Sequence, residues 1–176
     1  MDDPRYPIGR YVFELGVTDQ ERPRWIEEIA AAPEQLRAAV ANLSAAQLDT
    51  PYRQGGWKVR QVVHHLPDSH LNAYVRFKLA LTEEAPTIKP YEEARWAELP
   101  DGRAGPIALS LDLLAALHER WVLMLRQMQP VDFGRVFFHP EHRRTMSLDE
   151  ILGMYAWHGR HHIAQITSLR DRMGWH

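Results

Sequence analysis

Two of the ten histidines in this sequence, His158 and His162, stand four residues apart in a segment with helical periodicity. Residues at that separation lie one above the other on one face of an α-helix, so the two imidazoles can share one metal ion. The chain contains no cysteine, so a metal would be held by nitrogen and oxygen ligands, and no protein thiol can act as a nucleophile. The pair therefore indicates a divalent metal site.

The face that this pair occupies supports the metal hypothesis. The apolar stripe of the segment consists of Leu148, Ile151, Leu152, Tyr155, Ile166, Leu169 and Met173. Between Tyr155 and Ile166 the stripe must pass through positions 158, 159 and 162, which hold His, Gly and His. Burying an imidazole without partners costs roughly 1–3 kcal/mol, so two inward rings require either a metal or mutual hydrogen bonding as core histidines. His161 falls outside the stripe and is expected to face solvent.

A third ligand is expected on an earlier helix, which carries His64, His65 and His70. With about 100° of rotation per residue, His70 lies near the centre of the apolar stripe, His65 toward one edge and His64 further round. Pro67 makes the helical phase beyond it unreliable. Spacing therefore ranks His65 and His70 about equally as the third ligand.

Four amphipathic segments are predicted to form the helices that position these residues. Apolar residues recur at helical spacing over about 22–42, 58–82, 110–127 and 148–173. Pro33 should kink or split the first segment near residue 32, and Pro67 should bend the second. No convincing strand pairs accompany them. The sequence therefore favours an all-α fold, a four-helix bundle with long connections.

Caps and chain breakers divide the sequence between these helices. Ser44-Ala-Ala-Gln47 and Ser147-Leu-Asp-Glu150 fit capping boxes, which predict a helical turn over about 45–49 and the start of the last helix. The connections over about 83–105 and 131–145 are long, and such loops either line a binding site or wrap the outside of a bundle. The second is expected to be irregular or weakly extended. Without a repeat or linker, residues 1–176 are predicted to form a single domain.

Charge and hydropathy exclude several classes of partner. The net charge of −2 and the absence of a basic run argue against nucleic acid and anionic lipid. No apolar run approaches the roughly 20 residues that a membrane-spanning helix needs. The N-terminus lacks the order of charged and apolar residues found in signal peptides, and a chain without cysteine is compatible with a reducing compartment. A cytoplasmic protein is expected.

Most of the chain resembles a known family, the DinB-like superfamily, and most closely its YfiT-type branch, whose members are described as metal-dependent hydrolases. The matching stretches are Tyr6-Pro-Ile-Gly9, Leu48-Asp-Thr-Pro-Tyr-Arg53, Gly55-Gly-Trp-Lys-Val-Arg-Gln-Val-Val-His-His65, Asp68-Ser-His70, Arg76-Phe-Lys-Leu79, Trp157-His158, His161-His-Ile-Ala164 and Met173-Gly-Trp175. This long joint pattern is far more specific than a single pair of histidines.

The resemblance implies a four-helix bundle with one histidine ligand from the second helix and two from the last. Carried over by position, these ligands are His65, His158 and His162, which decides between His65 and His70. Pro67 departs from the family, where an Ala-like residue is expected, and it stands close enough to His65 to shift it. The resemblance also implies a homodimer.

Three imidazoles leave a coordination position open, as in a catalytic metal site, and nitrogen ligands suit Zn²⁺ or Ni²⁺. Such an ion can activate water, which predicts a metal-dependent hydrolase acting on a small molecule. The resemblance implies an alternative, a metal-dependent S-transferase that uses a low-molecular-weight thiol such as bacillithiol. A metal-binding stress-response bundle without catalysis is a third hypothesis.

Three further residues are weaker catalytic candidates. Asp68 stands one turn from His65, where it could orient a ligand ring or be a surface carboxylate. His70 could be a hydrogen-bonded core histidine or an acid–base group. Arg160 could bind a substrate carboxylate through two hydrogen bonds or be solvated.

Overall fold

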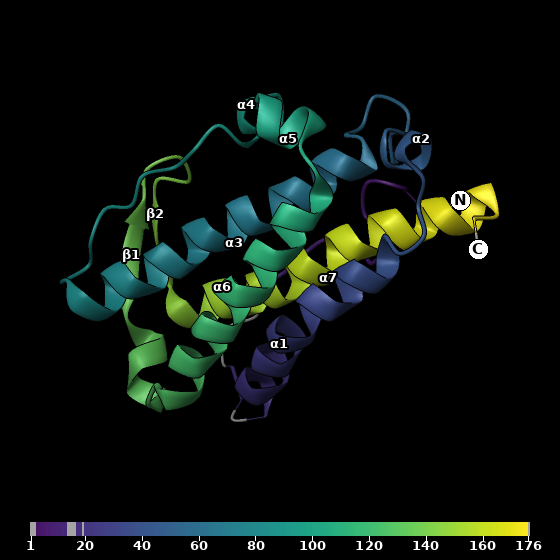
Figure 1. Cartoon of the computed structure of the whole chain (residues 1–176). Coiled ribbons are helices and arrows are strands. Elements are labelled where there is room, and N and C mark those ends of the chain that lie inside the picture. The colour runs from purple at the N-terminus through teal and green to yellow at the C-terminus, as the bar shows by residue number, and fades with distance from the viewer. Residues whose placement is uncertain (1–2, 14–16, 19, 176) are drawn as a thin grey trace.

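The computed structural model describes residues 3–13, 17–18 and 20–175. Four long helices form a bundle (Figure 1): α1 (Glu21–Ala39), α3 (Val59–Thr82), α6 (Ile107–Gln127) and α7 (Leu148–Met173). Helix α1 packs against α6 and α7, and α3 packs against the same two helices. The ring order is therefore α1, α6, α3, α7, and the predicted all-α four-helix bundle is confirmed. No helix in the described part of the chain is long and apolar enough to cross a bilayer.

Short elements occupy the connections. They are α2 (Ala45–Leu48), α4 (Glu93–Trp96), α5 (Pro100–Ala104), the 3₁₀ helix η1 (Pro130–Gly134), and the strands β1 (Val136–His139) and β2 (Arg144–Ser147). The strands pair antiparallel, with Val136 opposite Ser147. The expectation of no strand pair was wrong, because four-residue strands are too short to show a clear alternation in sequence. The hairpin also holds the connection after α3, since Phe138 N–H donates to Pro86 O at 2.9 Å and Ile88 N–H donates to Phe138 O at 3.1 Å.

The predicted caps form, with one difference. Ser44 and Gln47 close a complete capping box at α2, and Gly174 ends α7 with a φ of 65°. Ser147 accepts from Glu150 N–H at 3.2 Å. The Glu150 carboxylate does not complete the second box, because it pairs with the Arg144 guanidinium on β2.

The two helix-internal prolines are accommodated within continuous helices. Pro33 lies inside α1 and Pro67 inside α3, and neither helix is interrupted. Of the kink or split expected at Pro33, the split does not occur. Packing explains the difference, because α1 buries Ile29, Ala32 and Leu36 on both sides of the proline, and this burial offsets the lost backbone hydrogen bond.

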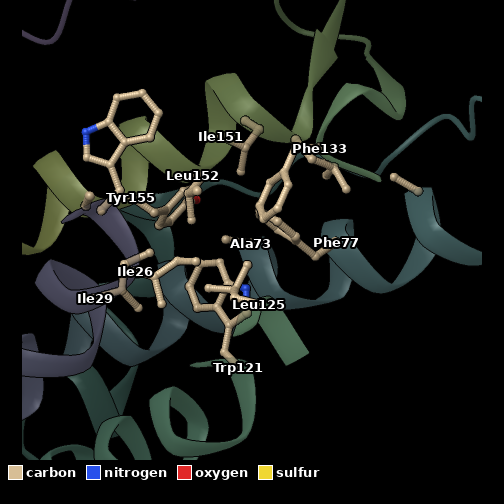
Figure 2. Packing of buried hydrophobic residues seen from close by; sticks show 14 of the residues in the cluster. Ile26, Ile29, Ala73, Phe77, Trp121, Leu125, Phe133, Ile151, Leu152 and Tyr155 are labelled. Carbon is tan, nitrogen blue, oxygen red and sulfur yellow. The ribbon is translucent and has the colours of Figure 1, made fainter. Parts of the chain in front are cut away.

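The hydrophobic core is divided along the bundle into two clusters. One lies at the hairpin end and includes Phe77, Trp121 and Tyr155 (Figure 2). The other lies toward α2 and includes Leu66 and Ile166. Three of the four helices carry histidines where the two clusters meet or directly beside that boundary: His65 and His70 on α3, His118 on α6, and His158, His161 and His162 on α7. The bundle therefore carries a polar layer in its interior.

Candidate metal centre

His65 of α3 meets His158 and His162 of α7 within this polar layer. Each ring offers one nitrogen, and the three nitrogens lie within 4.8 Å of one another. The Nε2 atoms of His65 and His158 are 3.3 Å apart. Two nitrogens bound to a tetrahedral zinc ion at about 2.0–2.1 Å stand roughly 3.4 Å apart, so this pair already has the spacing of two ligands of one ion.

His70, which spacing alone ranked equal to His65, occupies a different position. Its side chain is fully buried, at 0% exposure. Its Nε2 lies 3.1 Å from Nδ1 of His158, which is a different nitrogen from the one that faces His65. The structure thus places His70 behind a ring of the cluster rather than in it.

A line of hydrogen bonds determines which nitrogen of His158 is free of hydrogen. His118 Nδ1 lies 2.6 Å from the carbonyl oxygen of Ile29, which can only accept, so this nitrogen carries the hydrogen. His118 Nε2 then accepts from His70 Nδ1 at 2.8 Å. His70 Nε2 in turn accepts from His158 Nδ1 at 3.1 Å. With neutral rings, this line of hydrogen bonds, which starts at the Ile29 carbonyl on α1, places the hydrogen of His158 on Nδ1. Its Nε2 therefore keeps a lone pair, which is directed at the cluster.

A second line of the same kind orients His162. The amide nitrogen of Gln165 donates to the carbonyl oxygen of Arg5 at 3.2 Å, which fixes the orientation of the amide. The amide oxygen Oε1 of Gln165 therefore accepts from His162 Nδ1 at 2.9 Å. The hydrogen of His162 is on Nδ1, and its Nε2 retains a lone pair. The N-terminal arm thus contributes to the cluster through a main-chain carbonyl.

Burial keeps these rings neutral. Desolvation, and next the neighbouring His161, lowers the pKa of His65 to about 4. Desolvation followed by the nearby histidines holds the pKa of His158 and of His162 well below the usual value of 6.5. Neutral imidazole is the form that binds a metal ion. Three neutral rings with nitrogens close together fit a divalent ion that accepts nitrogen ligands.

The cluster forms part of the wall of a cavity of about 400 Å³. Trp57, from the loop before α3, packs on His65 with ring centroids 4.8 Å apart. The same cavity is lined by Arg5 and Tyr6 of the N-terminal arm, by Tyr52, Arg53, Gly55 and Gly56 of that loop, by Glu93 of α4, and by Trp157, His161 and Gln165 of α7. A small molecule can therefore reach the three histidines.

Two of the weaker catalytic candidates lie away from this cavity. Asp68 is half-buried on α3 and lines neither this cavity nor the neighbouring one described below. Burial, and next the charge of Asp101, raises the pKa of Asp68 to about 6. Arg160 is largely exposed and pairs with Glu28, with Nε and Oε2 3.2 Å apart. The structure brings neither Asp68 nor Arg160 to the cluster.

Sequence reasoning misplaced one histidine and overlooked another. His161, expected to face solvent, is buried at 6% exposure. Its ring stacks on that of Trp157, with centroids 4.4 Å apart, and it also contacts Tyr6 of the N-terminal arm. The arm therefore covers the face of α7 that was expected to be open to solvent. His118 received no functional prediction, although it interrupts the apolar stripe of α6 between Leu114 and Trp121. A polar ring inside an apolar stripe marks His118 in the sequence, as it marks His158.

Comparison with known proteins identifies the family of this chain. Residues 28–166, which include the three histidines, match the DinB superfamily. The chain is 53% identical over 175 residues, 99% of this chain and 100% of the relative, to a protein of Bacillus mycoides (strain KBAB4) whose name proposes metal-dependent hydrolase activity. A protein of Bacillus cereus (strain 03BB102) matches with the same identity and coverage and carries the same kind of name.

The fold is similar to that of YfiT from Bacillus subtilis, with a TM-score of 0.96 and 48% sequence identity. The similarity covers 98% of this chain and 99% of that one. YfiT is described as a probable metal-dependent hydrolase with an unusual four-helix bundle topology.

Proposed function

Because this chain belongs to the DinB superfamily, we propose that it is a metal-dependent hydrolase of a small molecule, with His65, His158 and His162 as the metal ligands. The convergence of three neutral ring nitrogens at the wall of a cavity carries the proposal. The names of the relatives and the description of YfiT support hydrolysis over thiol transfer and over metal binding without catalysis.

The all-nitrogen donor set supports Zn²⁺ or Ni²⁺ as the ion. When bound, such an ion supplies Lewis acidity toward a substrate oxygen and toward water. The protein contributes the fixed orientation of its ligands. The hydrogen bonds that Ile29 O and Arg5 O accept, from His118 and Gln165, set the tautomers of His158 and His162 before any ion arrives.

Glu93 is proposed to carry the proton that hydrolysis must move from water to the leaving group. It is the acidic residue among the described residues that line the cavity of the cluster. Desolvation, and next the charge of Glu141, raises the pKa of Glu93, which makes its carboxylate a better proton acceptor. Glu93→Gln should therefore keep the metal and lose turnover, whereas a loss of metal from this variant would make Glu93 a ligand instead.

The ligand assignment is tested by elemental analysis of the purified protein and its variants. Wild type should hold a stoichiometric divalent ion, and His158→Ala should lose it. His64→Gln is the matched control, because His64 is buried next to His65 but bonds Ser110 Oγ and Gly105 O instead of the cluster. Retention of a full equivalent of ion by His158→Ala would show that the ligands are other residues.

The reaction class is tested with a panel of esters, amides and phosphoesters, assayed with and without a chelator. Metal-dependent hydrolysis that disappears in His158→Ala is the expected result. A parallel assay supplies a thiol and a haloaromatic acceptor. Metal-dependent conjugate formation without any hydrolysis would replace the hydrolase proposal with thiol transfer.

A homodimer is proposed as well, on the family resemblance and on an apolar face of α6. Leu109, Leu113 and Leu123 recur at helical spacing on this helix and are 69%, 47% and 63% exposed. Burying such a face between two copies would remove it from water. Sedimentation equilibrium measures the assembly directly, and a monomer at micromolar concentration would contradict the proposal.

A further inference from the structure

Arg76, on α3, is a buried cation that lacks a bonded anion. The residue is only 8% exposed. Within the described part of the chain, no carboxylate or carbonyl oxygen forms an ion pair or hydrogen bond with its guanidinium. Other partly enclosed arginines do have such partners: Arg60 bonds Asp49, and Arg135 bonds Ala80 O. A cation enclosed by protein on most sides attracts an anion more strongly than one in bulk water, so this position favours a bound anion.

The guanidinium of Arg76 reaches a cavity of about 510 Å³. This cavity lies between α3, the segment leading into α4, the hairpin and α7. Its deeper wall includes His139 and Tyr155, which are 4% and 5% exposed. Tyr91 lines it too, and the hydroxyl of Tyr91 is buried with no hydrogen-bond partner among the described residues. Two polar groups without partners thus border one cavity.

The charges in this cavity suit a single negative charge at its base. The carboxylates of Glu92, Glu93 and Glu141 also line it. Glu92 and Glu141 are solvent-exposed and form its mouth, where water screens them. Desolvation, and next the charge of Glu141, raises the pKa of Glu93, which favours its uncharged form. Burial, and after it the charges of His142 and Arg76, lowers the pKa of His139 to about 4. Near neutral pH His139 is therefore an uncharged ring, and Arg76 supplies the positive charge at the base.

This cavity adjoins the metal centre. His158 and Glu93 line both it and the cavity of the histidine cluster. Arg76 follows His65 by eleven residues on the same helix, which is three turns, so both side chains leave the same face. Their backbones are about 16 Å apart along the axis, and an arginine side chain leans back toward the helix N-terminus, which shortens this gap. A molecule that passes His158 can therefore contact both sites.

We propose that Arg76 forms an anion subsite that binds a carboxylate of the substrate while the bond to be hydrolysed lies at the histidine cluster. A guanidinium matches a carboxylate through two parallel hydrogen bonds. The single charge of the subsite favours a carboxylate over a phosphate dianion, which the acidic residues at the mouth would repel more strongly. The placement of the scissile bond rests on the proposed function, whereas the anion subsite does not.

Anion binding is tested on the full chain without added metal, with acetate as the probe. Arginine Nε–H signals are followed by NMR, and the signal of Arg76 is assigned by its absence from Arg76→Gln. Acetate should shift this signal in a saturable manner, and binding should weaken roughly tenfold or more in Arg76→Gln, because hydrogen bonds to charged groups are strong. Arg76→Lys, which keeps the charge but not the fork, should bind with intermediate affinity.

Arg60→Gln is the matched control. Arg60 lies on the same helix, but its Nε bonds Asp49 Oδ1 at 3.0 Å, so this variant should bind acetate like wild type. An Arg76 signal that acetate leaves unmoved would overturn the proposal, as would equal acetate affinity in wild type and Arg76→Gln. Tighter binding of inorganic phosphate than of acetate would overturn the choice of carboxylate. Urea unfolding checks that the variants fold.

A second assay links the subsite to the reaction. Pairs of esters or amides that differ only in a distal carboxylate or its neutral amide are compared in the metal-loaded protein. Wild type should prefer the acid in kcat/KM, and Arg76→Gln should lose the preference while keeping its metal content. Turnover without preference for the acid would refute the subsite as a substrate site. Acetate binding at Arg76 in a protein without hydrolytic activity would instead contradict the proposed function and leave the anion site standing.

Discussion

His70→Phe should weaken metal binding although His70 is not itself a proposed ligand. The substitution keeps a ring between Tyr155 and Trp121, whose centroids lie 5.0 and 6.1 Å from that of His70. It removes the acceptor of His158 Nδ1–H at 3.1 Å and the donor to His118 Nε2 at 2.8 Å. His158 then loses the partner that keeps its hydrogen on Nδ1.

The expected magnitudes follow from these two contacts. Removing a hydrogen-bonded partner of a metal-binding histidine typically lowers metal affinity about 10–100-fold, which corresponds to roughly 1.4–2.7 kcal/mol. Two buried nitrogens are also left unsatisfied, and each costs about 1–3 kcal/mol of folding free energy. His118→Phe acts one step further from the cluster and should have a smaller effect on affinity. The double variant should be less impaired than the sum of the two, because both interrupt one line of hydrogen bonds.

Zn²⁺ affinity is measured by competition with a chromophoric chelator, and stability by urea unfolding of the metal-free protein. His70→Gln should restore much of the affinity, since its amide oxygen can accept from His158 and its amide nitrogen can donate to His118. His64→Gln breaks bonds of similar length to Ser110 Oγ and Gly105 O, at 2.6 and 3.0 Å, and should lower stability without changing affinity. If His70→Phe binds Zn²⁺ as tightly as His64→Gln does, His70 plays no part in positioning the ligand.

Two glycines on α7 should respond oppositely to substitution by alanine. A Cβ at Gly153 would stand 2.8 Å from Tyr11 Oη and 3.1 Å from Trp25. Gly153→Ala should therefore lower the free energy of unfolding by about 1–3 kcal/mol. A Cβ at Gly159 meets nothing closer than 3.4 Å, so Gly159→Ala should leave stability unchanged or raise it by up to about 1 kcal/mol through helix propensity. A lower urea midpoint for Gly159→Ala than for Gly153→Ala would refute this packing. Burial raises the pKa of Asp68 from its usual 3.8 to about 6, so the folded protein binds the proton more tightly and loses stability as pH rises through that interval. Asp68→Asn should therefore raise the urea midpoint at about pH 8 but not at about pH 3, and an equal change at both would contradict the assignment.

The sequence by itself identified the features that depend on neighbours along the chain. Helix positions follow from the period of apolar residues, and the caps at Ser44 and Gly174 follow from residues within one turn of them. His158 and His162 belong to the same group, because a separation of four residues on a helix brings two rings together whatever surrounds them. The interruption of an apolar stripe by polar rings also marked the interior polar layer.

Only the tertiary structure decided how separate helices meet. Spacing could not choose between His65 and His70, since both approach the interior of the bundle from α3 and differ in which nitrogen of His158 they face. Other features also depend on segments outside the helix concerned. They are the pairing of β1 with β2, the contact of His118 with Ile29 O, and the unpaired guanidinium of Arg76. Periodicity reports which face of a helix is buried, whereas the partner of a buried polar group is set by the rotation and depth of the neighbouring helix, and these are fixed when the bundle packs.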